Sequence, residues 1–102
     1  MSGTELDIAK SIRALEWLKT ETVSILARLF KALLKGNRES AVENLALLVI
    51  NCFLLLKRLG LNYGQMELSV YDKTEALLKE GHPLEEWYGD LSSFKAYLDL
   101  KR

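Results

Sequence analysis

The sequence has few of the residues that covalent cross-links, metal sites and phosphate loops require. It contains one cysteine, one histidine and one proline. A single cysteine excludes an internal disulfide framework, and one histidine beside it is too few for the usual zinc sites. Neither a glycine-rich phosphate loop nor a nucleophile elbow is present. Several common classes of enzyme and of secreted protein are thereby excluded.

The chain also lacks an excess of charge of either sign. Fourteen basic and fourteen acidic side chains give a formal net charge of zero. Without a basic excess the chain has little to neutralise phosphates, which argues against a nucleic acid polymer as the main partner. Residues 1–7 are too polar and acidic for a signal peptide. We therefore expect a cytoplasmic protein with no membrane partner.

One long apolar run dominates the sequence. Residues 45–56 carry no charge and a single amide, Asn51. Apolar residues on every side predict a helix enclosed by other helices, and the run is shorter than the about 20 residues that span a bilayer. Cys52, inside this run, is expected to be a buried, inert thiol. The Asn51 amide either pairs across the bundle, as with its own copy in a dimer, or faces a small polar cavity; we expect the former.

The rest of the pattern predicts an all-α fold, a four- to five-helix bundle in a single domain over residues 1–102. Glycines at helix ends and short polar joins separate the segments. Thr4 is the expected cap of the first helix, and the weak junction at residues 20–22 leaves open whether the first two segments form one helix. An apolar content of 49% is generous for so small a body and predicts a homo-oligomer, most simply a dimer. The other expected helices cover residues 38–59, 62–80 and 91–100, with a turn at 83–89 and Phe94, Tyr97 and Leu98 on an inner face.

Three passages carry a resemblance to a known family. They are Leu-Phe-Lys-Ala-Leu-Leu-Lys-Gly-Asn at 29–37, Leu-Leu-Lys-Arg-Leu-Gly-Leu at 55–61, and the stretch 80–92 with its Glu-Glu-Trp-Tyr-Gly-Asp core. Together with Glu-Trp-Leu-Lys at 16–19, they resemble the MazG-like branch of the all-α nucleoside triphosphate pyrophosphohydrolases. The resemblance covers most of the chain and implies the helical-bundle fold.

The resemblance also implies where a magnesium site would lie. In the active enzymes, Glu-Glu-x-x-Glu on one helix and Glu-x-x-Asp on the next hold the ion, because magnesium prefers hard oxygen ligands. In register, the first motif falls on Ser24, Ile25 and Arg28. The second falls on Asn44 and Leu47, with Glu43 one residue before. None of these five positions is acidic, so the resemblance supports the fold and weighs against the chemistry.

A second candidate site lies near the C-terminus. His82, Glu85, Glu86 and Asp90 form the densest set of ionisable groups, beside Trp87 and Tyr88. They could form a relocated metal or acid–base site, or a nucleotide pocket with the indole stacked on a base. Ordinary helix-end chemistry is the interpretation we favour, with Asp90 capping the last helix and Trp87 closing the bundle end. The candidate catalytic residues are Glu43, His82, Glu85 and Asp90, and the candidate ligand-binding residues are Trp87, Tyr88 and Arg38.

Three hypotheses of function follow. In the first, the chain is a catalytically degenerate member that binds a nucleotide or a partner protein without hydrolysis. In the second, it is an active magnesium-dependent pyrophosphohydrolase whose carboxylates come from Glu39, Glu43, Glu85 or Asp90. In the third, it is a structural module that docks another helical protein. Magnesium is an expected cofactor only under the second hypothesis.

Overall fold

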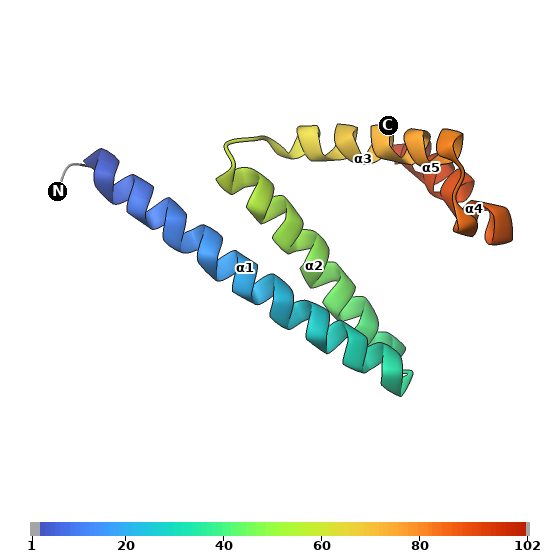
Figure 1. The fold of residues 1–102 in the computed structure, drawn as a ribbon, viewed down its shortest axis with the longest axis horizontal. Coiled ribbons are helices and arrows are strands. Elements are labelled where there is room, and N and C mark those ends of the chain that lie inside the picture. Colours follow the sequence, from blue (N-terminus) through green and yellow to red (C-terminus); the bar gives the residue numbers. More distant parts are fainter. Residues whose placement is uncertain (1–2, 102) are drawn as a thin grey trace. The chain divides into compact units, whose positions relative to one another are not determined.

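The computed structural model describes residues 3–101, and all the regular elements in that range are α-helices. The chain divides into two compact units, with the boundary between Asn62 and Tyr63. The all-α prediction is confirmed, whereas a single domain stays a prediction. The helices are α1 Gly3–Lys35, α2 Arg38–Arg58, α3 Tyr63–Glu80, α4 Pro83–Tyr88 and α5 Asp90–Lys101 (Figure 1).

Helix α1 is a single element of 33 residues, which answers the question left open at residues 20–22. The hydroxyl of Thr20 donates to the Glu16 carbonyl at 3.1 Å, and that of Thr22 donates to the Leu18 carbonyl at 2.7 Å. Such bonds to the preceding turn let threonine lie within a helix. Thr4 also lies inside α1, which begins at Gly3, and does not cap it from outside, so that prediction was wrong by one to two residues.

A tight turn joins α1 to α2. Gly36 has a φ of 67°, a left-handed conformation that glycine adopts without steric cost and that commonly ends helices. Asn37 then caps α2, because its side-chain oxygen accepts a hydrogen bond from the Ser40 backbone N–H at 3.1 Å. The predicted glycine stop and the predicted helix start after Asn37 are both confirmed.

Helices α1 and α2 pack against each other along one seam, which we define by its buried residues. The buried residues of each helix are spaced three, four or seven residues apart, so that one face of each helix is covered. Apolar side chains dominate the α1 side, while two of the three buried positions on α2 are asparagines. The seam residues are Leu18, Ile25, Leu29 and Ala32 of α1 and Ala41, Asn44 and Asn51 of α2.

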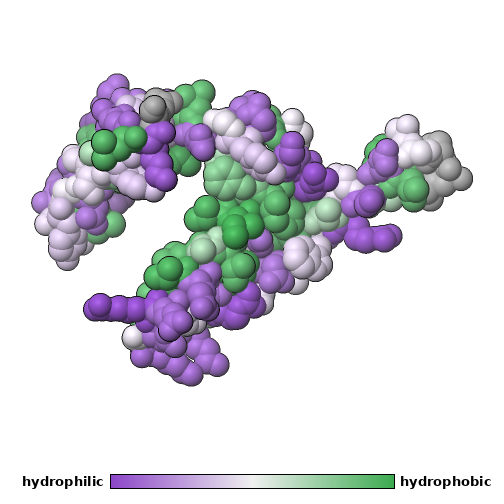
Figure 2. All heavy atoms as spheres, turned by 180° about the vertical axis from the view of Figure 1, so that it is seen from behind, coloured by the Kyte–Doolittle hydropathy of each residue, from purple (hydrophilic) through white to green (hydrophobic). Residues whose placement is uncertain are grey.

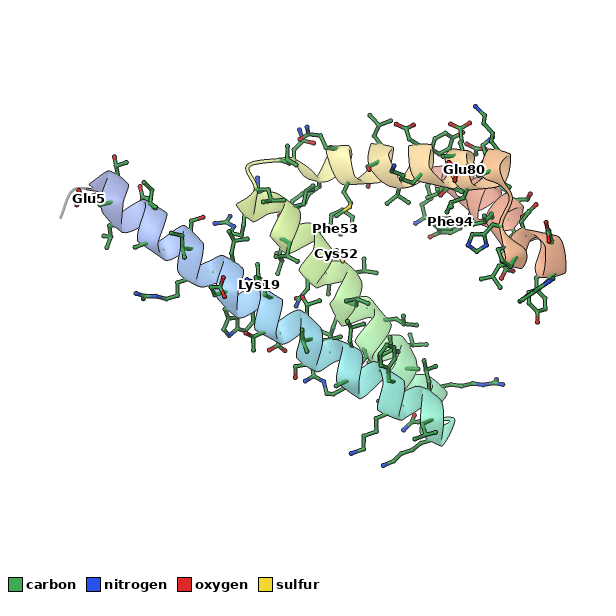
Figure 3. The ribbon with its side chains drawn as sticks, viewed as in Figure 1. Glu5, Lys19, Cys52, Phe53, Glu80 and Phe94 are labelled. Carbon is green, nitrogen blue, oxygen red and sulfur yellow. The ribbon has the colours of Figure 1, made fainter. Side chains whose placement is uncertain are left out.

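The prediction that the apolar run 45–56 is enclosed on all sides was wrong for this unit. Leu45, Val49 and Ile50 are about half exposed, at 47%, 53% and 51%. Cys52, expected to be buried, is exposed on α2 (Figure 3). The physical reason is that a two-helix hairpin covers only one face of α2, and its other apolar faces remain at the surface. Figure 2 shows the resulting apolar side chains at the surface of the molecule.

Among residues 3–101, one helix is long and apolar enough to cross a membrane by length and composition, namely α2. Only 17% of its apolar window is buried. The sequence argument counted only the uncharged run 45–56, whereas the whole helix has 21 residues. The core helix of a helical protein also meets these criteria of length and composition. The observation that distinguishes α2 is that its apolar faces are exposed.

The C-terminal unit is built from α3, α4 and α5, and α5 contacts both of the others. Among the residues of these three helices, Thr74 of α3 is the one that is buried. The Thr74 hydroxyl donates to the Val70 carbonyl at 2.7 Å. The segment expected to be a turn at 83–89 is helical, with Pro83 in the first turn, where its missing N–H costs nothing. Phe94 and Tyr97 were expected on an inner face, but they are 40% and 52% exposed.

The cap at the start of α2 gives a first testable prediction. Replacing Asn37→Ala removes the acceptor for the Ser40 N–H, and we expect the free energy of unfolding to fall by about 1 kcal/mol. Chemical denaturation followed by circular dichroism measures this change. The control Asn37→Ser keeps a capping oxygen and should remain close to the wild type. Equal losses in both variants would show that the cap does not stabilise the hairpin.

Candidate functional site

The positions aligned with the acidic motifs lie together on the hairpin, but as a neutral and cationic cluster. Arg28 of α1 donates from Nε to Asn44 Oδ1 on α2 at 3.3 Å. Its Nη1 donates to Ser24 Oγ, one turn earlier in α1, at 3.0 Å. Three of the five aligned positions are therefore joined by hydrogen bonds across the two helices.

Further bonds hold this cluster in place. Asn44 is buried, and its amide donates to the Ser40 carbonyl at 2.9 Å. Arg28 Nη2 also forms an ion pair with Glu21, at 3.5 Å from Glu21 Oε1. Because the Arg28 side chain is 48% exposed, its guanidinium retains contact with water. The cluster thus has one cation, one carboxylate and a buried amide that orients the cation.

These residues do not fit a magnesium ion. The guanidinium carries charge of the same sign as the metal and has no lone pair to donate. Ile25 and Leu47 offer no donor atoms, and Ile25 is 1% exposed within the seam. Magnesium requires an array of oxygen ligands, usually including carboxylates. No group of three or more His, Cys, Asp or Glu side chains within residues 3–101 is placed to hold a metal ion.

The remaining candidates on α2 lie near its N-terminus. Arg38 is the first residue of the helix, and Glu39 follows in its first turn, where the helix dipole favours a carboxylate. Glu43 is exposed and directly precedes the buried Asn44 in the chain. All three side chains lie within the first two turns of α2. Among the described residues, Glu43 is not part of a group of side chains that could hold a metal ion.

The C-terminal candidates act mainly as helix caps. His82 precedes α4, and its Nδ1 accepts a hydrogen bond from the Leu84 N–H at 3.1 Å. Glu85 accepts from the Ser92 N–H at 2.8 Å and from the Ser92 hydroxyl, at the first turn of α5. These two hydrogen bonds lower the pKa of Glu85 below its ordinary value. Asp90 is the first residue of α5, so the expected cap is supplied instead by Glu85.

The aromatic candidates lie at the surface. Trp87 is 69% exposed and Tyr88 is 74% exposed, so Trp87 does not close the end of its unit as expected. Helix α4 has six residues, and none of them is buried. The structure therefore groups His82 and Glu85 as capping residues and leaves the two rings exposed.

Sequence reasoning missed a polar cluster between α3 and α5. Two causes raise the pKa of Tyr71 above its ordinary value. The larger is a hydrogen bond to Asp99, and the second is the partial burial of the side chain. Lys95 Nζ lies 3.8 Å from Glu75 Oε2 and 5.9 Å from the centre of the Tyr71 ring. The signal available was the four-residue spacing of Tyr71 and Glu75, and of Lys95 and Asp99. The pairing of the two helices could not be read from spacing alone.

Asn51 is the unusual residue of the seam. It is 6% exposed, and its Nδ2 atom has no hydrogen-bond partner among the described residues. The expected partner across the helices is therefore not found for this atom within residues 3–101. An unpaired buried donor costs roughly 1–3 kcal/mol.

The two seam asparagines allow a matched comparison. Replacing Asn51→Leu removes the unpaired donor, and we expect the free energy of unfolding to rise by about 1–2 kcal/mol. Asn44→Leu removes a bonded amide and leaves Arg28 without its acceptor, so stability should fall by about 1–3 kcal/mol. Urea denaturation of both variants tests the contrast. A loss of stability in Asn51→Leu as large as that in Asn44→Leu would mean that Asn51 has a partner in solution.

Glu85 predicts a pH dependence of stability. Its pKa is lowered from 4.5, so its stabilising contribution is present above pH 4.5 and is lost as the pH falls through the lower, folded-state value. Glu85→Gln should therefore be less stable than the wild type at pH 7, and this difference should shrink in acid. Thermal unfolding at pH 7 and pH 3 measures it, with Glu86→Gln as the exposed control. A difference independent of pH would contradict the assignment.

Comparison with known proteins identifies one family. The model of the MazG-like family matches residues 8–91, which is most of the chain. No curated protein and no solved structure matches the chain significantly. The matched range includes the whole α1–α2 seam, the Arg28 cluster and the caps of α4 and α5. The chain belongs to the MazG-like family.

Proposed function

We propose that this protein is a catalytically degenerate MazG-like protein, which binds a nucleotide without hydrolysing it. The observation that carries the proposal is the Arg28 cluster. A guanidinium lies where the resemblance would require a ligand of a divalent cation, and it is bonded to Ser24 and Asn44. A cation held there by hydrogen bonds repels a second cation, so it opposes magnesium-assisted phosphate chemistry.

The charge around Arg28 supports a nucleotide as the ligand. Lys31 and Lys35 follow Arg28 at spacings of three and four residues, so the three cations share one side of α1. Lys31 and Lys35 are exposed, and Arg28 is half exposed. We call these three residues the basic edge. Glu21 offsets only part of this charge. Arginine and lysine bind phosphates directly, so the edge can supply the positive charge that a metal supplies in an enzyme.

The test combines a turnover assay with a binding assay on the full chain. We expect no pyrophosphate release from a panel of nucleoside triphosphates with magnesium. At 100 times its Kd, a bound nucleotide should stabilise the fold by about 2.7 kcal/mol, seen as a raised melting temperature. Arg28→Gln should remove most of that rise. Arg13→Gln, an exposed charge on α1 outside the basic edge, is the control and should retain it.

Two outcomes would overturn the proposal. Magnesium-dependent turnover that is abolished by Glu43→Gln or Asp90→Asn would show an active enzyme with relocated carboxylates. A melting temperature that no nucleotide raises, with or without magnesium, would leave the protein without a nucleotide ligand.

A further inference from the structure

One side of α1 carries a stripe of six side chains that the contact with α2 does not bury. They recur at alternating spacings of four and three residues, which keeps side chains on one face of a helix. None of the six is a buried residue of the seam, and three of them form the basic edge. We call this set the α1 stripe. Its residues are Trp17, Glu21, Ser24, Arg28, Lys31 and Lys35.

The seam fixes which side of the hairpin the α1 stripe follows. Trp17 directly precedes the buried Leu18, and each of the other three seam residues of α1 likewise follows a member of the stripe. One residue is a rotation of about 100° in an α-helix, so the stripe runs along one flank of the contact face. The bond from Arg28 to Asn44 of α2 agrees with this placement, because it crosses the seam from that flank. Trp17 and the basic edge therefore lie on the same side of the hairpin.

Trp17 places an aromatic ring at one end of the stripe. The residue is 62% exposed, so its indole is open to a ligand from solvent. Aromatic side chains bind nucleobases by stacking, which requires no particular base because every base has a π-face. Trp17 precedes Arg28 by eleven residues, or about 17 Å along the helix axis. Both side chains are long and shorten this span, which then suits an extended nucleotide and is too long for inorganic triphosphate.

Glu21 lies between the ring and the cations of the stripe. Its side chain is 35% exposed and is paired with Arg28, so part of its charge is offset. A carboxylate is a hydrogen-bond acceptor, and in nucleotide sites it commonly accepts from the hydroxyl groups of the ribose. The order along the stripe is thus a stacking ring, an acceptor for a sugar and a set of phosphate-binding cations. A nucleotide has its base, ribose and phosphates in the same order.

A cation also lies on the other side of the ring. Arg13 precedes Trp17 by one turn and is exposed. Helix α2 has 21 residues against the 33 of α1, so Arg13 lies in the part of α1 that extends past its partner. Arg28, by contrast, is held by hydrogen bonds to Ser24 and Asn44. A preorganised cation loses less conformational entropy when it binds a phosphate, so the phosphates are expected toward Arg28.

We propose that Trp17 is the base-stacking residue of a nucleotide site along the α1 stripe, with the phosphates on the basic edge and the ribose beside Glu21. The inference rests on the proposed nucleotide binding and adds how the base is held. Because stacking tolerates every base, the site accepts purine and pyrimidine nucleotides alike. The base is thereby assigned to Trp17 and not to Trp87, the other exposed tryptophan.

The first experiment measures the Kd of the full chain for ATP, CTP and inorganic triphosphate by calorimetry at one salt concentration. Trp17→Ala should raise the Kd for both nucleotides about five- to a hundredfold, the effect of removing one stack between a base and an aromatic ring. It should leave the Kd for inorganic triphosphate unchanged, and Trp17→Phe should keep most of the nucleotide affinity. Trp87→Ala removes a similarly exposed indole, at 69% against 62%, and is the matched control with wild-type affinity.

The second experiment observes Trp17 directly and does not depend on the folding of a Trp17 variant. The chain has two tryptophans, so Trp87→Phe leaves Trp17 as the only source of indole fluorescence. ATP and CTP should quench that fluorescence saturably, with the Kd that calorimetry gives. Inorganic triphosphate has no base and should leave the fluorescence unchanged.

The outcomes separate this inference from the proposed function. Nucleotide binding that needs Arg28 but is unchanged in Trp17→Ala would overturn the inference and leave the proposed function standing. An equal loss of inorganic triphosphate binding would indicate a structural role for Trp17, and a loss in Trp87→Ala instead would move the base to α4; either result overturns the inference. A loss in Arg13→Gln instead of Arg28→Gln, or a wild type that binds neither nucleotide, would overturn both proposals.

Discussion

The antiparallel contact between α1 and α2 is the constraint on which the described N-terminal unit depends. It buries the few residues that hold the hairpin together and fixes which residues of one helix face which residues of the other. Because Arg28 and Asn44 meet across this contact, the polar cluster is a direct product of the same register. Moving either helix by one residue would separate them and expose the seam. Packing and chemistry in this unit are therefore not independent.

Much of the secondary structure could be predicted because local signals determine it. Gly36 and Asn37 mark a helix end and a helix start through backbone conformation and capping, which act over a few residues. Pro83 also acts locally, in the first turn of α4, but the sequence predicted a turn there and not a helix. By contrast, Asp90 was chosen as a cap by residue type, whereas the bond to the Ser92 N–H comes from Glu85, seven residues earlier. The pattern of residue types could not show which carboxylate reaches the helix end.

The sequence predicted where the candidate site lies, but not which interactions its side chains make. The resemblance placed the motif positions on two helices, and three of these side chains do meet. Spacing alone could not show that Arg28 bonds to Asn44 and Ser24, because an arginine exposed to solvent fits the same spacing. The burial of α2 was overestimated for a different reason. An apolar sequence does not show how much of each helix face the rest of its own chain covers.

The lengths of the two paired helices have a consequence for how the hairpin folds. Helix α1 has 33 residues and α2 has 21, so about 12 residues, or roughly 18 Å of α1, extend past the end of its partner. In that overhang Leu6, Ile8 and Ile12 are all more than half exposed. Isolated helices of this length are marginal in water. The overhang is therefore the segment of α1 whose helical state contributes least to the cooperative unfolding of the hairpin, and a surface that covered it would couple binding to helix formation.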